Sequence, residues 1–189
     1  MPSQSVVKSL HPVLPVSGLL SASLLASLVM ASSLALAEAA PVLQPSDDQS
    51  RVARIVTRQL SIQHYNRTLL NDSLSGDIWK RYLSDMDNQR VYLLASDIQA
   101  FEPWRLRLDD QLKAGQLAPA FTMFNRYQLR LRERLEFANA ELAGNSKALL
   151  DFTGKDSIEI DRKDAPWARN KAELDQLWRL RLKSAALTL

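Results

Sequence analysis

The sequence predicts a mainly α-helical domain of about five helices, with one short strand-like segment near residues 157–161. Apolar residues recur at helical spacing through most of the chain after residue 50. Residues that favour helix starts precede several of these apolar stripes. The alternation of apolar and polar residues that is typical of a strand occurs in the stretch SIEIDR (157–162).

The first 37 residues are predicted to be an export signal that is cleaved from the mature chain. Lys8 supplies a weakly positive start, and an apolar, serine-rich run follows over residues 13–36. The small-x-small sequence Ala-Leu-Ala ends at Ala37, where we expect signal peptidase to cut. Cleavage after Ala39 or Ala40 is the alternative within this interpretation.

A membrane anchor that stays uncleaved is the rival interpretation of the same segment. A spanning helix needs about 20 strongly apolar residues. Pro15 and a series of serines interrupt the apolar run here. We therefore predict contact with the membrane only through the export signal.

The charge balance argues against a nucleic-acid partner. Removal of residues 1–37 takes away Lys8 alone among the charged groups, so the formal net charge falls from +3 to +2. Charges of both signs are well mixed along the rest of the chain. The sequence contains no cysteine, which excludes disulfides, thiolate metal sites and a cysteine nucleophile.

Residues 38–50 are predicted to be a linker, and residues 51–189 to form the helical domain. One apolar face indicates the first helix and contains Val52, Ile55, Val56, Leu60, Ile62, Tyr65 and Leu69. The second helix is expected to begin after Asn71 or Asp72, because either residue is a good N-cap. Its predicted core residues are Leu74, Ile78, Trp79, Tyr82, Leu83 and Met86.

The third helix is predicted to begin at Ser96, with Gln99 completing a capping box. Pro103 should bend or shorten it, since proline cannot donate a backbone hydrogen bond. Gly115 is expected to end it as a C-cap. The apolar stripe between these signals consists of Phe101, Trp104, Leu108 and Leu112.

The fourth and longest helix is predicted over about residues 118–143. Its apolar residues at a and d spacing are Phe121, Phe124, Leu131, Leu135, Ala138 and Leu142. Asn170 with Glu173 then indicates the start of a last helix, whose apolar residues are Leu174, Leu177, Trp178 and Leu182. That helix has no stop signal, so we expect the chain to be truncated at Leu189.

The stretch KRYLSDMDNQRVYLLASDIQAF (80–101) holds three aspartates and invites comparison with a calcium loop. Counted from Asp85 as position 1, position 6 is Arg90 where the loop requires glycine. Position 12 is Ser96 where the loop requires glutamate. We therefore predict that this stretch joins two helices and holds no metal.

Other candidate residues have plain structural interpretations. His64, the one histidine after residue 37, has no acidic neighbour in sequence and is predicted to be structural or at the surface. A row of arginines at four-residue spacing could bind an acidic tail, but a solvated face is preferred: Arg126, Arg130 and Arg134, close to Glu133, Glu136 and Glu141. The sequence contains no Gly-x-Ser-x-Gly elbow and no glycine-rich phosphate loop. We predict no catalytic, cofactor-binding or metal-binding residue in this chain.

Three stretches together resemble one family. They are VARIVTRQLSIQHYNR (52–67), IWKRYLSDMDNQRVYLLASDIQAF (78–101) and DFTGKDSIEIDRKDAPWARNKAELDQLW (151–178). The same stretches occur in this order and at similar spacing in the tail-specific proteases, the carboxy-terminal processing peptidases of the Gram-negative periplasm. The resemblance covers roughly residues 50–187.

The resemblance implies an N-terminal helical domain placed before a PDZ domain and a serine protease core. In the family, a serine nucleophile and a lysine base form the catalytic dyad, and both lie downstream of this region. No residue of this chain matches either one, so none is carried over and this chain alone is predicted to be inactive. The implied location is the periplasm.

The resemblance also implies partners of protein or peptide character: the downstream PDZ and protease domains, the C-terminal tails of substrates, and a periplasmic lipoprotein adaptor. From the residues themselves we expect no cofactor, no metal and no nucleic acid. The expected role is a scaffold and docking domain of an endopeptidase that processes proteins from their C-terminal tails. The alternative is a stand-alone periplasmic adaptor without catalysis, built from the same helices.

Overall fold

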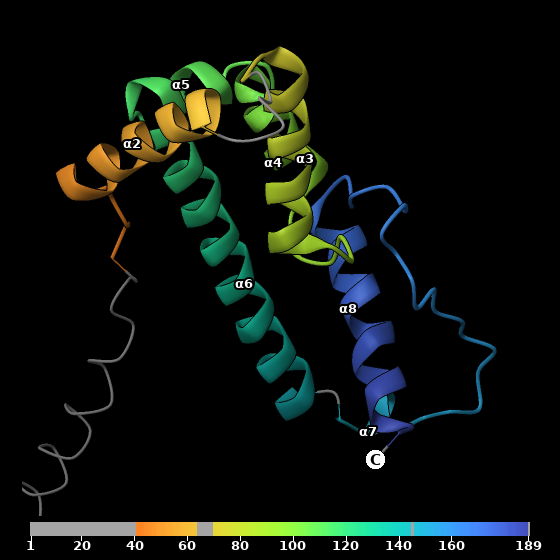
Figure 1. Ribbon diagram of the computed structural model, residues 1–189. Helices are drawn as coiled ribbons and strands as arrows, with labels where there is room; N and C mark the ends of the chain where they lie inside the picture. The colour runs from red at the N-terminus through yellow and green to blue at the C-terminus, as the bar shows by residue number, and fades with distance from the viewer. Residues whose placement is uncertain (1–40, 64–69, 145, 189) are drawn as a thin grey trace, which may run out of the picture. The chain divides into compact units, whose positions relative to one another are not determined.

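The regular elements of the described residues are helices, which confirms the mainly α prediction. The computed structural model describes residues 41–63, 70–144 and 146–188, so the export signal with Ala37, His64 and the end of the first predicted helix lie outside the described residues. The elements are α2 (Asp47–Gln63), α3 (Asp72–Asp87), α4 (Ala95–Phe101), the 3-10 helix η1 (Glu102–Trp104), α5 (Leu108–Ala114), α6 (Ala118–Gly144), α7 (Ser146–Leu149) and α8 (Lys171–Ala186) (Figure 1).

Two predicted N-caps form as expected from their local sequence. The side-chain oxygen of Asn71 accepts a hydrogen bond from the backbone N–H of Leu74 at 3.1 Å and starts α3. The side-chain oxygen of Asn170 accepts from the N–H of Glu173 at 3.0 Å and starts α8. Each bond satisfies one of the N–H groups that a helix start leaves without a partner.

The third predicted helix is divided into α4, η1 and α5. Pro103 lies in η1, where its missing N–H interrupts the α-helical hydrogen bonds. The expected capping box at Ser96 and Gln99 is wrong: the carboxylate of Asp97 accepts from the N–H of Leu94 at 3.0 Å, so the helix starts one residue earlier. Gly115 ends α5 in the left-handed conformation, with φ of 72°, as predicted.

The strand-like segment 157–161 is not a strand. It has no regular secondary structure, no neighbouring strand pairs with it in the described part of the chain, and Ile160 is 83% exposed. Alternation of residue types alone does not supply the pairing partner that a strand needs. The one β-bridge among the described residues joins Leu94 to Ala168.

The predicted linker, residues 38–50, is shorter than expected. Helix α2 begins at Asp47, so the last four linker residues form its first turn. Residues 41–46 have no regular secondary structure, and the Asn125 amide of α6 exchanges two hydrogen bonds with the backbone of Leu43, at 2.8 and 3.0 Å. This segment is therefore held against α6.

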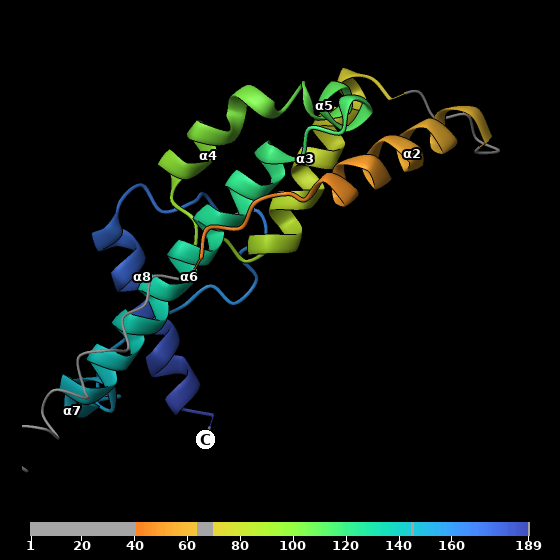
Figure 2. The ribbon, with the colours of Figure 1, turned by 90° about the vertical axis from the view of Figure 1, so that its left-hand side faces the viewer.

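The main core lies where α3, α4, α5 and α6 meet. Its buried residues are Trp79, Leu83, Leu93, Phe101, Leu108 and Met123. A second, smaller cluster, formed by Leu94, Ala168 and Leu174, joins the start of α8 to the loop before α4. Helix α2 packs against α5, and α8 packs against α6, which it crosses in the view of Figure 2 (Figures 1 and 2).

A helix that crosses a bilayer must be both long and strongly apolar. Among the helices of residues 41–63, 70–144 and 146–188, none combines the two properties.

Candidate functional site

Asp87 organises the loop that follows α3. Its side chain is 2% exposed, and one carboxylate oxygen accepts from the N–H of Val91 at 2.8 Å. The other oxygen accepts from the N–H groups of Leu93 at 2.9 Å and Tyr92 at 3.2 Å, and from the Trp167 indole at 3.3 Å. This carboxylate therefore satisfies three backbone donors of one loop and ties that loop to a segment 80 residues away.

The neighbouring aspartates are engaged elsewhere. Asp85 is exposed and pairs with Arg81 at 2.9 Å on the surface of α3, and Asp97 points toward α6. In the part of the chain that the structure describes, no group of three metal-ligating side chains is close enough to hold an ion. The stretch joins α3 to α4, and its acidic residues each have a structural partner.

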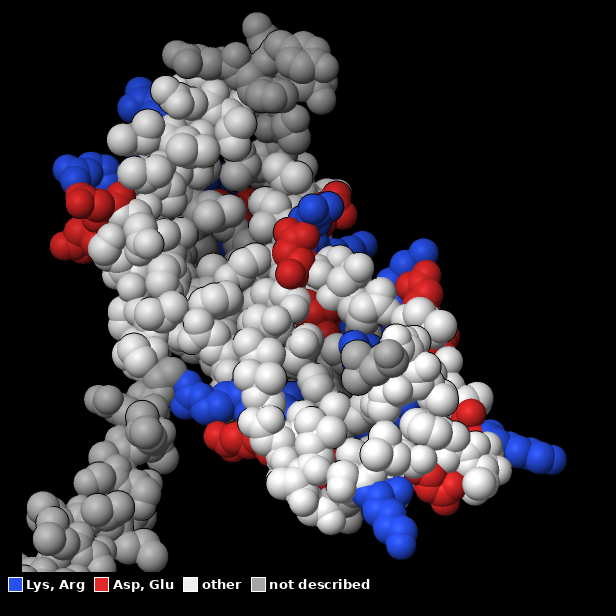
Figure 3. Space-filling model, turned by 90° about the horizontal axis from the view of Figure 1, so that it is seen from below, with Lys and Arg blue, Asp and Glu red and all other residues white. Residues whose placement is uncertain are grey.

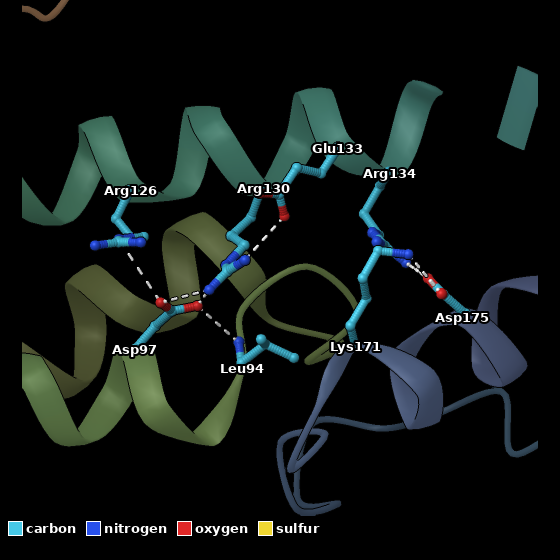
Figure 4. A network of polar contacts seen from close by, with 8 residues as sticks. All are labelled: Leu94, Asp97, Arg126, Arg130, Glu133, Arg134, Lys171 and Asp175. Carbon is cyan, nitrogen blue, oxygen red and sulfur yellow. Dashed lines mark hydrogen bonds and ion pairs between the residues drawn. The ribbon is translucent and has the colours of Figure 1, made fainter. Parts of the chain in front are cut away.

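The inner face of α6 carries the arginine row that the sequence showed (Figure 4). Arg130 binds Asp97 through two hydrogen bonds, at 2.8 and 3.1 Å, and also contacts Glu133 at 2.9 Å. Arg126 lies 3.7 Å from the same Asp97 carboxylate. Asp97 thus caps α4 and fixes α4 to α6. The hydrogen bonds that Arg130 donates to Asp97 are the main reason that the pKa of Arg130 is raised above its ordinary value.

A second pair joins α6 to α8. Arg134 is 1% exposed and contacts Asp175 at 2.5 Å, while Lys171 contacts the other oxygen of Asp175 at 2.7 Å (Figure 4). Arg179 lies one turn after Asp175 in α8 and binds Glu141, which lies two turns after Arg134 in α6, at 2.8 Å. These ion pairs join α6 to α8 at two positions.

The prediction of a solvated arginine face is therefore wrong for Arg130 and Arg134. The predicted apolar a and d stripe of α6 is confirmed in part: Ala138 is buried and Phe121, Phe124 and Leu131 are half-buried, whereas Leu135 and Leu142 are each 53% exposed. Buried charge is stable only when it is paired and hydrogen-bonded. The partners that allow these arginines to face inward lie on α4 and α8, far away in sequence, and spacing along α6 alone could not reveal them.

The acidic partner of Arg134 gives a testable pH dependence. Burial by itself would raise the pKa of Asp175, but hydrogen bonds from Lys171 and Arg134 outweigh burial and hold the pKa below its ordinary value of 3.8. A carboxyl whose pKa is lowered in the folded state stabilises the fold above the ordinary pKa, and this contribution is lost as the pH falls through the folded-state pKa.

We expect an Asp175→Asn variant to lose less stability than the parent protein between about pH 5 and pH 2, because it lacks this titration. Urea denaturation at a series of pH values measures the difference. Parallel pH profiles for the two proteins would contradict the role given to Asp175.

One buried hydroxyl that the sequence did not single out also has a structural role. Ser75 is fully buried in α3, and its hydroxyl donates to the carbonyl of Arg105 at 2.8 Å. The same oxygen accepts from the N–H of Leu108 at 2.8 Å, at the start of α5. Both hydrogen-bonding functions of this serine are thus used to hold α3 against α5.

The apolar stripe of α2 is largely uncovered. Its outward residues are exposed by 44% to 63%: Val52, Ile55, Val56, Leu60 and Ile62. The helix instead buries Thr57, whose hydroxyl donates to the carbonyl of Ala53 at 2.7 Å. An apolar groove of about 360 Å³ lies between α2, α3 and α5, with Leu74, Ile78 and Leu112 in its walls.

Charges on the surface occur mostly as mixed neighbours. Figure 3 shows one face, on which Lys and Arg lie beside Asp and Glu in several places. Much of that face carries neither sign of charge (Figure 3). The described residues on this side therefore form no continuous basic surface.

Comparison with known proteins places these features in context. Residues 56–189 match the family model described as the tail specific protease N-terminal domain. The chain is also similar to the tail-specific protease of Haemophilus influenzae, with 32% identity over 158 residues. This match covers 79% of the chain and 22% of the relative, so the chain spans less than a quarter of the relative's length.

Proposed function

The chain belongs to the tail-specific protease N-terminal domain family, and from this membership we propose that it is the helical scaffold and docking domain of a periplasmic serine endopeptidase. That enzyme would process or degrade proteins from their C-terminal tails. Its PDZ domain and its serine–lysine dyad would belong to parts of the protease other than residues 42–188. The domain itself acts by holding those parts, and a lipoprotein adaptor is a further candidate partner.

The exposed apolar stripe of α2 is the observation that carries the docking role. Contiguous apolar surface on a folded domain is unfavourable in water, at about 25 cal/mol for each Å² left uncovered, and marks an interaction site. The groove beside the stripe has the shape that receives apolar side chains from another helix or an extended segment. Leu135 and Leu142 of α6 add a second uncovered apolar strip.

We assign the remainder of the protease chain as the occupant of the α2 surface. The Haemophilus relative is several times longer than the matched region, so a large body of protein is available to cover it. The buried polar groups of this domain also support a structural role, with catalysis in other parts of the protease. Ser75 and Asp87 form hydrogen bonds with backbone groups of neighbouring segments. Asp97 and Arg134 form ion pairs between helices. Contacts of both kinds fix the helices relative to one another, as a scaffold requires.

An antibody raised against residues 41–188 tests the proposal in the native host. We expect it to detect, in the fraction released by osmotic shock, a polypeptide several times heavier than the 21.3 kDa of this chain. Material captured by the antibody should degrade an unstructured protein with an apolar C-terminal tail. A product of 21.3 kDa or less without peptidase activity would instead indicate a separate adaptor, and a cytosolic product would contradict the location.

A further inference from the structure

A second groove lies on a different side of α3 from the α2 surface and differs from it in character. It has a volume of about 330 Å³ and lies between α3 and the segment that precedes α8. Its walls include two tryptophans and three cations: Trp79, Trp167, Lys80, Arg90 and Lys163. Apolar surface and positive charge thus converge in one concave site.

The positive charge of this groove is poorly neutralised. Asp87 is the acidic residue in its wall, and both oxygens of Asp87 are already occupied by four N–H donors. Lys163 has an exposed contact with Asp161 at 3.3 Å, a kind of pair that contributes little in water. Lys80 forms no ion pair with any residue that the structure describes.

Arg90 is held in an unusual conformation at the edge of the groove. Its φ is 53°, a left-handed value that is uncommon for a residue other than glycine and is frequent at functional sites. The guanidinium lies 4.3 Å from the centre of the Trp167 ring, and one of its nitrogens donates to the carbonyl of Ala165. A guanidinium has five N–H donors, so this contact leaves others able to bind a carboxylate.

Trp79 contributes its side chain to the wall of the groove, while its indole N–H is turned into the protein interior. Its side chain is 8% exposed, and its indole N–H has no hydrogen-bond partner within the described residues. Ser84 and Asn88 lie on the same wall, where the Ser84 hydroxyl donates to the Asn88 side-chain oxygen at 3.1 Å, which leaves the NH₂ group of Asn88 to contact a peptide backbone.

We propose that this groove binds an acidic segment of polypeptide in an extended conformation. A carboxylate side chain of the ligand is held by Lys80, Arg90 and Lys163, where the geometry of the guanidinium allows a two-point contact. A neighbouring apolar side chain packs on the tryptophan rings. This site lies apart from the apolar α2 surface, and its assignment does not depend on the proposed role in proteolysis.

Tryptophan fluorescence of the purified protein tests the proposal with a short blocked peptide of alternating glutamate and leucine. A peptide with glutamine in place of glutamate is the ligand control. We expect a saturable fluorescence change with the glutamate peptide that weakens as salt is added. The combined Lys80→Gln and Lys163→Gln variant should bind it roughly three- to tenfold more weakly.

The matched control is the combined Lys147→Gln and Lys155→Gln variant, which removes the same charge at exposed positions outside the groove. It should bind the glutamate peptide as the parent protein does. Circular dichroism of each variant verifies that the helices are intact. Equal binding of the two peptides, equal weakening by the two variants, or no saturable change at millimolar peptide would each overturn the proposal.

Discussion

Replacing Asp87 with alanine should lower the free energy of unfolding by about 3–5 kcal/mol. The change removes the acceptor of three backbone N–H groups and one indole N–H. The three backbone donors lie in a loop whose Val91 and Leu93 are 2% and 0% exposed, so water cannot replace the carboxylate without opening the core. Urea denaturation followed by far-ultraviolet circular dichroism measures the loss.

Asp85→Ala is the matched control for this variant, because it removes an aspartate from the same helix turn. Asp85 is exposed and pairs with Arg81 on the surface, so its loss should change the unfolding free energy by less than about 1 kcal/mol. Similar effects of the two substitutions would show that Asp87 does not organise the loop.

Arg134→Met should destabilise the protein by about 2–4 kcal/mol. Arg134 is almost fully buried, and its removal leaves Asp175 with Lys171 as its remaining cation. A double-mutant cycle with Asp175→Leu isolates the pair. The double variant should be more stable than the sum of the single losses predicts, by about 1–3 kcal/mol, because neither charge is then left unpaired. Simple additivity of the single variants would contradict a direct Arg134–Asp175 interaction.

Signals that act over a few residues could be predicted from the sequence. Asn71, Asn170 and Gly115 end or start helices through contacts with residues three or four positions away, and the structure confirms all three. Pro103 divides a helix because its ring leaves the backbone nitrogen with no hydrogen to donate. The family resemblance was also carried by local motifs, and the family match confirms it.

The orientation of α6 could not be predicted in the same way. Its inner face is selected by Asp97 and Asp175, which are 33 and 41 residues away from the arginines they bind. Apolar spacing therefore identified Ala138 as an inward residue, but it could not show that Arg130 and Arg134 face inward while Leu135 and Leu142 are exposed.

The groove of Lys80, Arg90 and Lys163 was missed for a similar reason, because its cations lie on two segments separated by more than 70 residues. No single stretch of the sequence contains enough of the site to form a motif. In the sequence, Arg90 argues only against a calcium loop. Its left-handed backbone and its stacking on Trp167 appear only in the folded chain.

Hydrogen exchange in α2 most directly tests the claim that this domain is a scaffold whose apolar surface is covered by the rest of a protease. The amides of α2 should be compared in the isolated chain and in the complete native protease, with those of α3, which contributes Trp79 and Leu83 to the core, as the internal reference. We predict that α2 gains much more protection than α3 in the complete protein, because its exposed stripe becomes buried. Equal changes in the two helices would contradict the claim.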